Sequence, residues 1–286
     1  MGAAAPLWAA PRYRPVLAVQ TYVWSQHFAR QMQAARDHLE EIISGCAAAG
    51  YRNIELTGDY FAADLAAKTA ALLKQYQFQL PVVYNGGVLH QEAEAEKTIA
   101  RSVEIAERAK SCGLKAVNIN ASPKPKRERK TDAELAVQAR AIDRLAAELR
   151  KRGLRLFVHQ HDPEMAENAR EWRHIVKNTN PKRVEFCLDT HWVYRGGQDV
   201  MTILGECSAR LGAVHLRNSK NGVWLESFAD GDIDYRKVAA HLRKIGFQGY
   251  LVIELAYDKD TAITRPLVES LRLSREYAEE VFGVKA

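Results

Sequence analysis

This 286-residue sequence has no long hydrophobic run, no paired cysteines and no nucleotide-binding glycine loop. No apolar stretch is long enough to span a membrane, so we do not expect a membrane as a partner. The four cysteines lie far apart, without the CxxC spacing of zinc or redox sites, and we interpret them as buried thiols. Neither a GxGxxG motif nor a P-loop follows any predicted strand, which argues against an open nucleotide-binding sheet.

The N-terminal residues also lack a recognisable signal. Residues 1–15 are rich in alanine and proline, without the charged start and continuous apolar centre of a signal peptide. We interpret them as an arm that is disordered or draped over the surface, and we expect a cytoplasmic protein, or a periplasmic one if an export signal was removed. Residues 16–286 are enough for one large core, and nothing indicates a second domain.

The charge of the chain is a weak guide to function. The formal net charge of +6 and the pI near 9.1 would suit an anionic substrate or nucleic acid, but Lys and Arg are spread along the whole chain. The densest run, KPKRERK from Lys124 to Lys130, could attract a phosphate or a carboxylate. Because a charged loop of this kind is more often solvated surface, we do not assign it to the substrate.

Short apolar segments alternate with helical patterns along the chain. Strands are predicted at 16–21, 52–56, 80–85, 115–120, 154–160, 183–188, 212–216 and 250–255. Helices are predicted between them, among others at 35–49, 62–76, 91–111, 131–152 and 266–282, with Gly113 and Gly153 as C-terminal caps of two of them. Eight such βα units predict a single-domain α/β protein, a closed (β/α)8 TIM barrel.

All eight predicted strands have polar residues at or near their carboxyl ends. These residues are Gln20, Glu55, Asn85, Asn118, Asn120, His159, His161, Asp189, His215 and Glu254. The carboxyl ends of barrel strands are where active sites lie. A hydrogen-bonded core group explains any single one of these residues about as well as a site does, but it does not explain polar ends on every strand.

The residue types at these strand ends predict a divalent metal site. Imidazoles combined with carboxylates suit Mn, Co, Zn or Fe(II), whereas an all-oxygen set would suit Mg or Ca. His159 and His161 are two residues apart on one predicted strand, so both point to the same face. Which of the two binds the metal and which acts on the substrate stays open at this point.

Four motifs carry a resemblance that covers nearly the whole chain. GLRLFVHQHDPEM, CLDTHWVYRGGQD, AVHLRNSKNGVW and YLVIEL, in this order, resemble the xylose isomerase-like barrels, the sugar isomerase/epimerase superfamily related to endonuclease IV. The resemblance implies one divalent ion, Mn first and otherwise Co, Zn, Fe or Mg. Its ligands come from strands five to eight, which here are His159, Asp189, His215 and Glu254.

Two positions depart from the pattern of the superfamily. The strand-five ligand, usually Glu, is His159 in an HxH sequence, which resembles a branch with a YHNH-like motif. The common HxKD motif is HLRN, so Arg217 and Asn218 stand where Lys and Asp are usual. Because epimerases of this superfamily use two glutamates as acid and base, a His paired with Glu254 is expected here.

The resemblance implies a metal-dependent isomerase or epimerase that acts on a sugar or keto-sugar. Removal of the proton next to a carbonyl gives an enediolate, and His159 or His161 together with Glu254 are the expected catalytic proton carriers. Return of the proton to another carbon or face isomerises or epimerises the sugar. Loss of a β-substituent would instead make the enzyme a dehydratase or a keto-glycoside lyase or hydrolase.

Further residues near the strand ends are expected to bind the substrate. They are Glu55, Asn85, Asn120, His191, Trp192, Arg217, Trp224 and Glu226. The indoles could cover the apolar face of a sugar ring or simply pack within the loops, and Glu55 could equally be the partner of a neighbouring base.

Two other classes of protein compete with this interpretation. A nuclease on the same fold needs more metal ligands than the nine histidines supply, several of them helical, so we do not expect nucleic acid as a partner. A non-catalytic sugar-binding barrel remains open because the strand-five Glu is missing. A homo-oligomer is also open, since barrels of this family often pair, but the sequence gives no interface signal.

Overall fold

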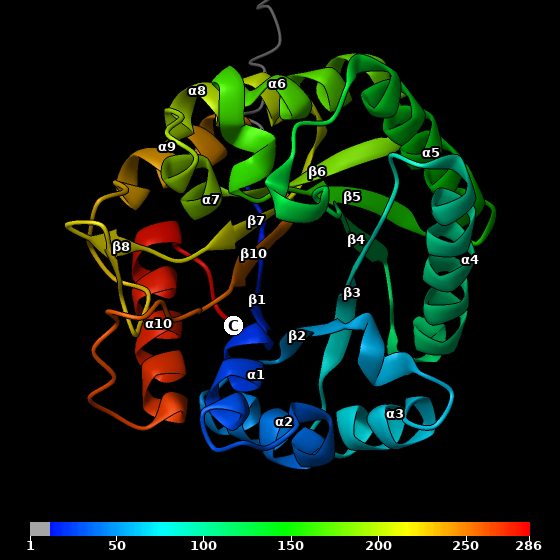
Figure 1. The fold of residues 1–286 in the computed structure, drawn as a ribbon. Coiled ribbons are helices and arrows are strands. Elements are labelled where there is room, and N and C mark those ends of the chain that lie inside the picture. Colours follow the sequence, from blue (N-terminus) through cyan, green and yellow to red (C-terminus); the bar gives the residue numbers. More distant parts are fainter. Residues whose placement is uncertain (1–11) are drawn as a thin grey trace, which may run out of the picture.

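A closed barrel of eight parallel strands forms the centre of the protein, and helices surround it (Figure 1). The structure is a computed structural model and describes residues 12–286, so the first eleven residues of the expected N-terminal arm lie outside the described residues. Around the barrel each strand pairs with its neighbour in the chain, and the last one, β10, pairs with both β7 and β1. The predicted (β/α)8 barrel is confirmed.

The barrel strands are β1 (Val16–Gln20), β2 (Asn53–Thr57), β3 (Gln79–Gly87), β4 (Ala116–Ala121), β5 (Arg155–His159), β6 (Val184–Asp189), β7 (Leu211–Leu216) and β10 (Tyr250–Ile253). The helices are α1 (Tyr22–Ala29), α2 (Leu39–Ala48), α3 (Ala66–Gln75), α4 (Glu92–Ala109), α5 (Asp132–Lys151), α6 (Asp162–Asn178), α7 (Thr190–Arg195), α8 (Val200–Cys207), α9 (Tyr235–Lys244) and α10 (Leu267–Phe282). Two short strands that were not predicted, β8 (Ser219–Lys220) and β9 (Val223–Trp224), form an antiparallel hairpin after β7.

Local sequence signals set the ends of α5. Thr131 is its N-cap, and the Thr131 hydroxyl accepts a hydrogen bond from the backbone N–H of Glu134 while the Glu134 carboxylate accepts one from that of Thr131. At the other end Gly153 has a φ of +73°, a left-handed conformation that favours glycine. This helix therefore begins and ends within one residue of the prediction.

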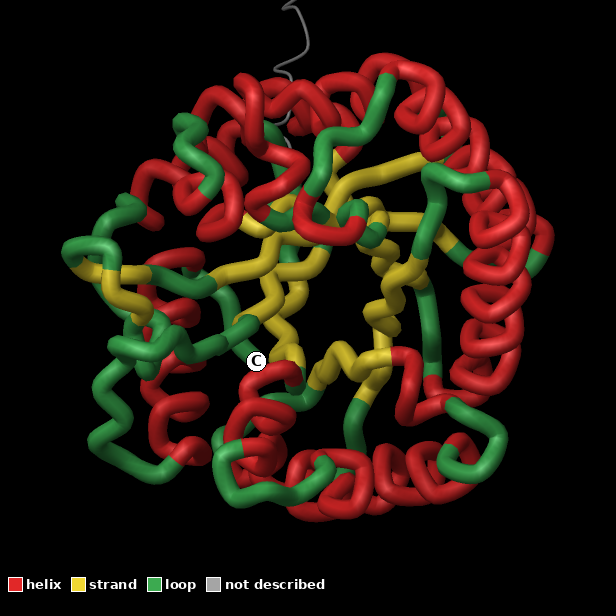
Figure 2. The backbone as a smooth tube through the Cα atoms, in the orientation of Figure 1, coloured by secondary structure: helices red, strands yellow, loops and turns green. Residues whose placement is uncertain are grey.

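The inside of the barrel changes from apolar to polar along each strand. Near the amino ends, Val82, Ala116, Phe157, Cys187 and Ala213 pack together in a small cluster of their own. Because side chains alternate between the two faces of a strand, the positions two residues further on also point inward. On four of these five strands they are Asn118, His159, Asp189 and His215. The interior of the barrel is therefore polar at the carboxyl ends of the strands. Figure 2 shows the closed ring that the strands form.

The described part of the N-terminal arm contacts the barrel. The Tyr13 hydroxyl donates to the Phe282 carbonyl at 3.0 Å, and the Arg14 N–H donates to the Phe247 carbonyl at the same distance. Among residues 12–286, the structure contains no helix that is both long and apolar enough to cross a membrane.

Candidate active site

The structure brings the four predicted metal ligands together at the carboxyl end of the barrel. His159, Asp189, His215 and Glu254 each offer one ligand atom, and these atoms all lie within 4.8 Å of one another. They come from β5, β6, β7 and the residue after β10, which are neighbours in the barrel. Three of them are almost completely buried, and Glu254 is the most exposed of the four, at 6%.

The neighbours of His159 leave one ring nitrogen free. Its Nδ1 lies 3.1 Å from Oδ1 of Asn120 on β4, so Nδ1–H donates to this amide oxygen. Its Nε2 therefore carries the lone pair and lies 3.6 Å from Asp189 Oδ2. Burial lowers the pKa of His159 to about 4, against the opposing effect of Asp189, so the ring is neutral near pH 7. Asn120 thus fixes the tautomer that a metal ligand needs.

His215 lies between two carboxylates. Its Nδ1 is 2.9 Å from Glu254 Oε2, and its Nε2 is 3.1 and 3.4 Å from the two oxygens of Glu55 on β2. Burial alone would lower the pKa of His215, but Cys187, Glu55 and Glu254 raise it well above its ordinary value. A proton and a metal ion would therefore compete for His215 Nδ1, while Glu55 orients the ring through its contact with Nε2.

The two carboxylate oxygens of Asp189 have different partners. Its Oδ1 accepts a hydrogen bond from the N–H of Trp192 at 2.8 Å and thereby caps α7. Its Oδ2 faces His159 and also lies 3.0 Å from the Arg217 guanidinium. Burial would raise the pKa of Asp189, but Arg217 and His159 outweigh it and hold this pKa well below its usual range. Asp189 is therefore ionised at neutral pH.

Arg217 lies directly behind the cluster, among aromatic rings. Its NH1 contacts Glu254 Oε2 at 3.1 Å, and its Nε donates to Nδ1 of His191 at 3.2 Å. The guanidinium carbon is 4.9 Å from the ring centroids of both Trp192 on α7 and Trp224 on β9. These are cation–π distances, so the two indoles stabilise the buried charge.

The donor set fits a divalent metal ion. Within residues 12–286, His159 Nε2 is buried without a hydrogen-bond partner, and Asp189 Oδ2 is buried with an ion-pair contact to Arg217 but no hydrogen bond. Three buried carboxylates, those of Glu55, Asp189 and Glu254, surround it, whereas Arg217 brings a single permanent positive charge. Buried charges need partners. With His215 neutral, as a metal ligand has to be, two negative charges remain, and a divalent cation would balance them.

His161 lies beside the cluster, in the loop after β5. Its ring contacts those of His159 and Trp192 edge to face, with centroid distances of 4.9 and 5.2 Å. Burial, together with the neighbouring His159, lowers the pKa of His161 to about 3. The ring is therefore neutral near pH 7.

Two predicted substrate-binding residues do not join the cluster. The Nδ2 of Asn85 donates to the Ser102 hydroxyl of α4 at 2.7 Å, because Asn85 follows the inward Tyr84 and so points outward to the helices. The Glu226 carboxylate accepts hydrogen bonds from the N–H and the hydroxyl of Thr264 and pairs with Arg265, so it links two loops. In the structure both side chains have structural partners.

Two buried residues near the site were not predicted. Tyr84 points into the barrel from β3, and its ring centroid is 5.3 Å from that of His159. Glu164 is 1% exposed, and its Oε2 accepts a hydrogen bond from the N–H of His161 at 2.8 Å. The alternation of β3 could have identified Tyr84, since it is the residue just before Asn85.

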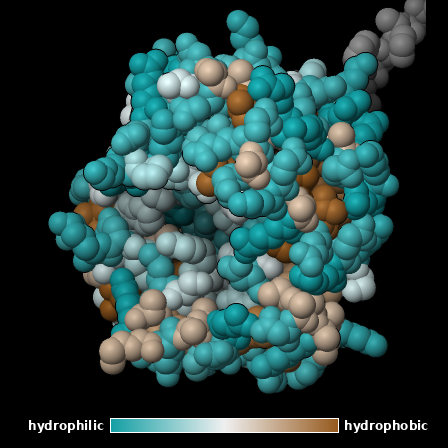
Figure 3. Space-filling view, turned by 45° about the vertical axis from the view of Figure 1, so that its right-hand side comes forward, coloured by the Kyte–Doolittle hydropathy of each residue, from teal (hydrophilic) through white to brown (hydrophobic). Residues whose placement is uncertain are grey.

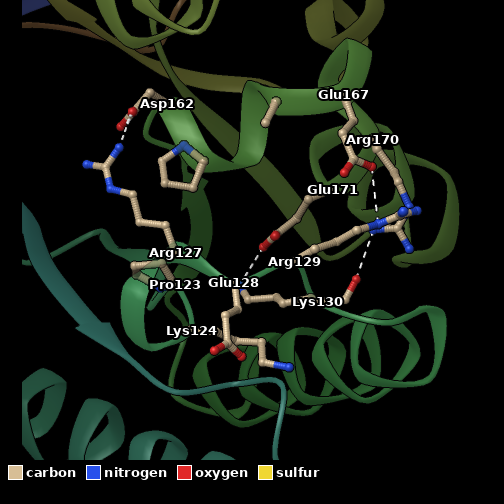
Figure 4. A pocket seen from close by; sticks show the side chains of 12 residues that line it. Pro123, Lys124, Arg127, Glu128, Arg129, Lys130, Asp162, Glu167, Arg170 and Glu171 are labelled. Atoms are coloured by element: carbon tan, nitrogen blue, oxygen red, sulfur yellow. Dashed lines mark hydrogen bonds and ion pairs between the residues drawn. The ribbon is translucent and has the colours of Figure 1, made fainter.

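The charged loop after β4 lines a separate pocket of about 240 Å³ (Figure 4). Four of its five basic residues have partners: Lys124 pairs with Glu134, Arg127 with Asp162 and Arg129 with Glu167, and Lys130 lies 2.6 Å from Glu171. Most of the charge of the run from Lys124 to Lys130 is therefore balanced within the protein.

The face of the protein drawn in Figure 3 is mostly hydrophilic and is hollowed near its centre.

The sequence model of the xylose isomerase-like TIM barrel family matches residues 43–277. The chain belongs to this family.

Among its relatives is an inosose dehydratase from Geobacillus kaustophilus, 23% identical over 85% of this chain and 87% of the relative. An inosose dehydratase from Geobacillus thermodenitrificans is 25% identical, but the match spans only 54% of this chain and 57% of that relative. A crystal structure of D-allulose 3-epimerase from Methylomonas sp. in complex with D-allulose superposes with a TM-score of 0.76 and 17% identity, covering 95% of this chain and 98% of that one. The structural likeness supports the fold.

Proposed function

We propose that this protein is a metal-dependent enzyme that acts on a sugar or keto-sugar by removing a proton next to a carbonyl group. The observation that carries this proposal is the convergence of His159, Asp189, His215 and Glu254 on one buried, negatively charged centre. A divalent ion there, Mn first among Mn, Co, Zn, Fe and Mg, would polarise the carbonyl and stabilise the negative charge of an enediolate. The names of the relatives support a sugar or cyclic polyhydroxy ketone as substrate.

The residues around this centre divide the remaining work. We assign the first proton transfer to His161, whose ring centroid lies 4.9 Å from that of His159. Glu254 follows β10, and the strands β6 and β7 lie between β10 and β5 in the barrel. Glu254 therefore approaches the substrate from another side than His161 does. Trp192 and Trp224 are placed to exclude water and cover the apolar face of the ring.

The unequal proton carriers favour elimination. A base that takes the proton and a different group that assists a leaving hydroxyl suit a dehydratase, and the G. kaustophilus relative carries that name. Epimerisation is the second candidate, because His161 and Glu254 approach from different strands and could act on opposite faces of one carbon. Both outcomes share the first proton abstraction.

The test combines metal analysis with exchange in D2O. The protein is purified, stripped with a chelator and reloaded separately with Mn²⁺, Co²⁺, Zn²⁺, Fe²⁺ and Mg²⁺. It is then incubated with open-chain and cyclic keto-sugars, with Asp189→Ala as the metal-deficient control. We expect one ion per chain and deuterium at the carbon next to the carbonyl; an enone absorbance indicates dehydration and a new sugar indicates epimerisation. One bound ion without exchange in any keto-sugar would support a sugar-binding barrel instead.

A further inference from the structure

Arg217 contacts the same two oxygens that a metal ion would use. Its side chain is 4% exposed, with NH2 lying 3.0 Å from Asp189 Oδ2 and NH1 lying 3.1 Å from Glu254 Oε2. The same oxygens also face the two predicted histidine ligands, since Asp189 Oδ2 is 3.6 Å from His159 Nε2 and Glu254 Oε2 is 2.9 Å from His215 Nδ1. The other oxygen of Asp189 is taken by the cap of α7.

We propose that Arg217 is an internal counter-cation that competes with the divalent ion for Asp189 and Glu254. This inference rests on the metal site of the proposed function. A metal ion binds carboxylate oxygen at roughly 2.0–2.2 Å and would stand only a few ångströms from the guanidinium. Because like charges repel strongly inside a protein, the guanidinium has to withdraw from these oxygens when the metal binds.

The surroundings of Arg217 allow this withdrawal without leaving the charge unsupported. His191 accepts a hydrogen bond from Nε at 3.2 Å, and the indole centroids of Trp192 and Trp224 each lie 4.9 Å from the guanidinium carbon. Neither support involves a metal ligand. Trp224 belongs to the β8–β9 hairpin, and the ring of His191 meets the Trp224 indole edge to face at 5.0 Å. The freed guanidinium would therefore remain beside the cluster, in contact with these three rings.

If Arg217 competes with the metal ion, removal of its charge should strengthen metal binding. In Arg217→Met the carboxylates of Asp189 and Glu254 lose their counter-charge, so we expect the variant to bind Mn²⁺ about tenfold or more tightly in isothermal titration. Arg217→Lys keeps the charge and should stay near the parent. Arg155→Met is the matched control: Arg155 also pairs with a carboxylate, Glu185, and lies 4.8 Å from an aromatic ring centroid, but at the amino end of β5.

Two further measurements cover a variant that folds poorly. Added Mn²⁺ should raise the melting temperature of Arg217→Met more than that of the parent, because ligand stabilisation follows affinity. In the parent itself, saturation with diamagnetic Zn²⁺ should change the fluorescence of the indoles that flank Arg217, and Arg217→Met should lose most of this change.

The outcomes separate this inference from the proposed function. If the parent binds one ion and Arg217→Met binds it equally or more weakly, with no fluorescence change in the parent, Arg217 does not compete and the metal site stands. If only Arg217→Met binds an ion, the competition is stronger than expected. If neither protein binds an ion, both the proposed function and this inference are wrong.

Discussion

Glu55→Gln tests whether a residue far away in the chain orients a metal ligand. Glu55 and His215 are 160 positions apart, yet the two Glu55 oxygens lie 3.1 and 3.4 Å from His215 Nε2. A carboxylate at Nε2 holds the proton there and leaves Nδ1 free for the metal. Glutamine fills the same space without the charge and can turn its NH2 group toward Nε2.

The expected effect is a weaker metal site in a folded barrel. Losing a carboxylate that orients a ligating histidine typically lowers metal affinity by about 10- to 100-fold, which corresponds to about 1.4–2.8 kcal/mol. We expect a loss in this range for Glu55→Gln. Glu55→Asp keeps the charge but withdraws it by one methylene group, so its loss should be smaller than that of the amide.

The assay is titration of chelator-treated protein with Mn²⁺, together with thermal unfolding. Glu164→Gln is the matched control, because Glu164 is equally buried but bonds to the His161 backbone and not to a predicted metal ligand. A Glu55→Gln variant that binds Mn²⁺ as tightly as the parent would refute the idea that Glu55 orients His215. Equal losses in Glu55→Gln and Glu164→Gln would point to a general effect of replacing a buried carboxyl group.

Three other perturbations test the site and the fold. Asp189→Ala, His215→Ala and Glu254→Ala should each lower the metal content measured by elemental analysis while the far-ultraviolet circular dichroism stays that of the parent; full metal content in all three would rule out the proposed ligand set. Burial, with Glu171, raises the pKa of Glu164 from its ordinary value of 4.5 to about 8. Between these two pH values the folded protein holds a proton that the unfolded chain has lost, so the stability that this proton contributes falls with rising pH and is lost as the pH passes through 8. The free energy of unfolding of Glu164→Gln, measured in urea, should therefore rise relative to that of the parent as the pH is raised from 5 to 8.5. A difference between the two proteins that does not change with pH would contradict the raised pKa of Glu164. Gly212→Ala places a Cβ 2.2 Å from the Phe157 ring, which should lower the free energy of unfolding by about 1–3 kcal/mol, and an unchanged urea midpoint would show that the ring moves aside freely.

Much of the fold could be predicted from the sequence, because strand and helix patterns are local. Period-two apolar segments separated by helical ones are enough for eight βα units, and the capping box at Thr131 places the start of α5. The same local reasoning missed the short α1 and α7 and the β8–β9 hairpin. These elements bury too few residues for a clear periodic pattern.

The sequence by itself determined which strands end in histidine or a carboxylate, the side-chain types that bind metals, since those residues interrupt apolar segments. Only the tertiary structure decided which strand-end side chains meet: Asn85 points away from the cluster, whereas Glu55 reaches across the barrel to His215. It also decided that Arg217 lies on the carboxylates of Asp189 and Glu254. The physical reason is that a shift of one residue within a strand decides whether a side chain points into or out of the barrel. Which side chains then meet across the barrel depends on how the eight strands close, and no local sequence pattern encodes this.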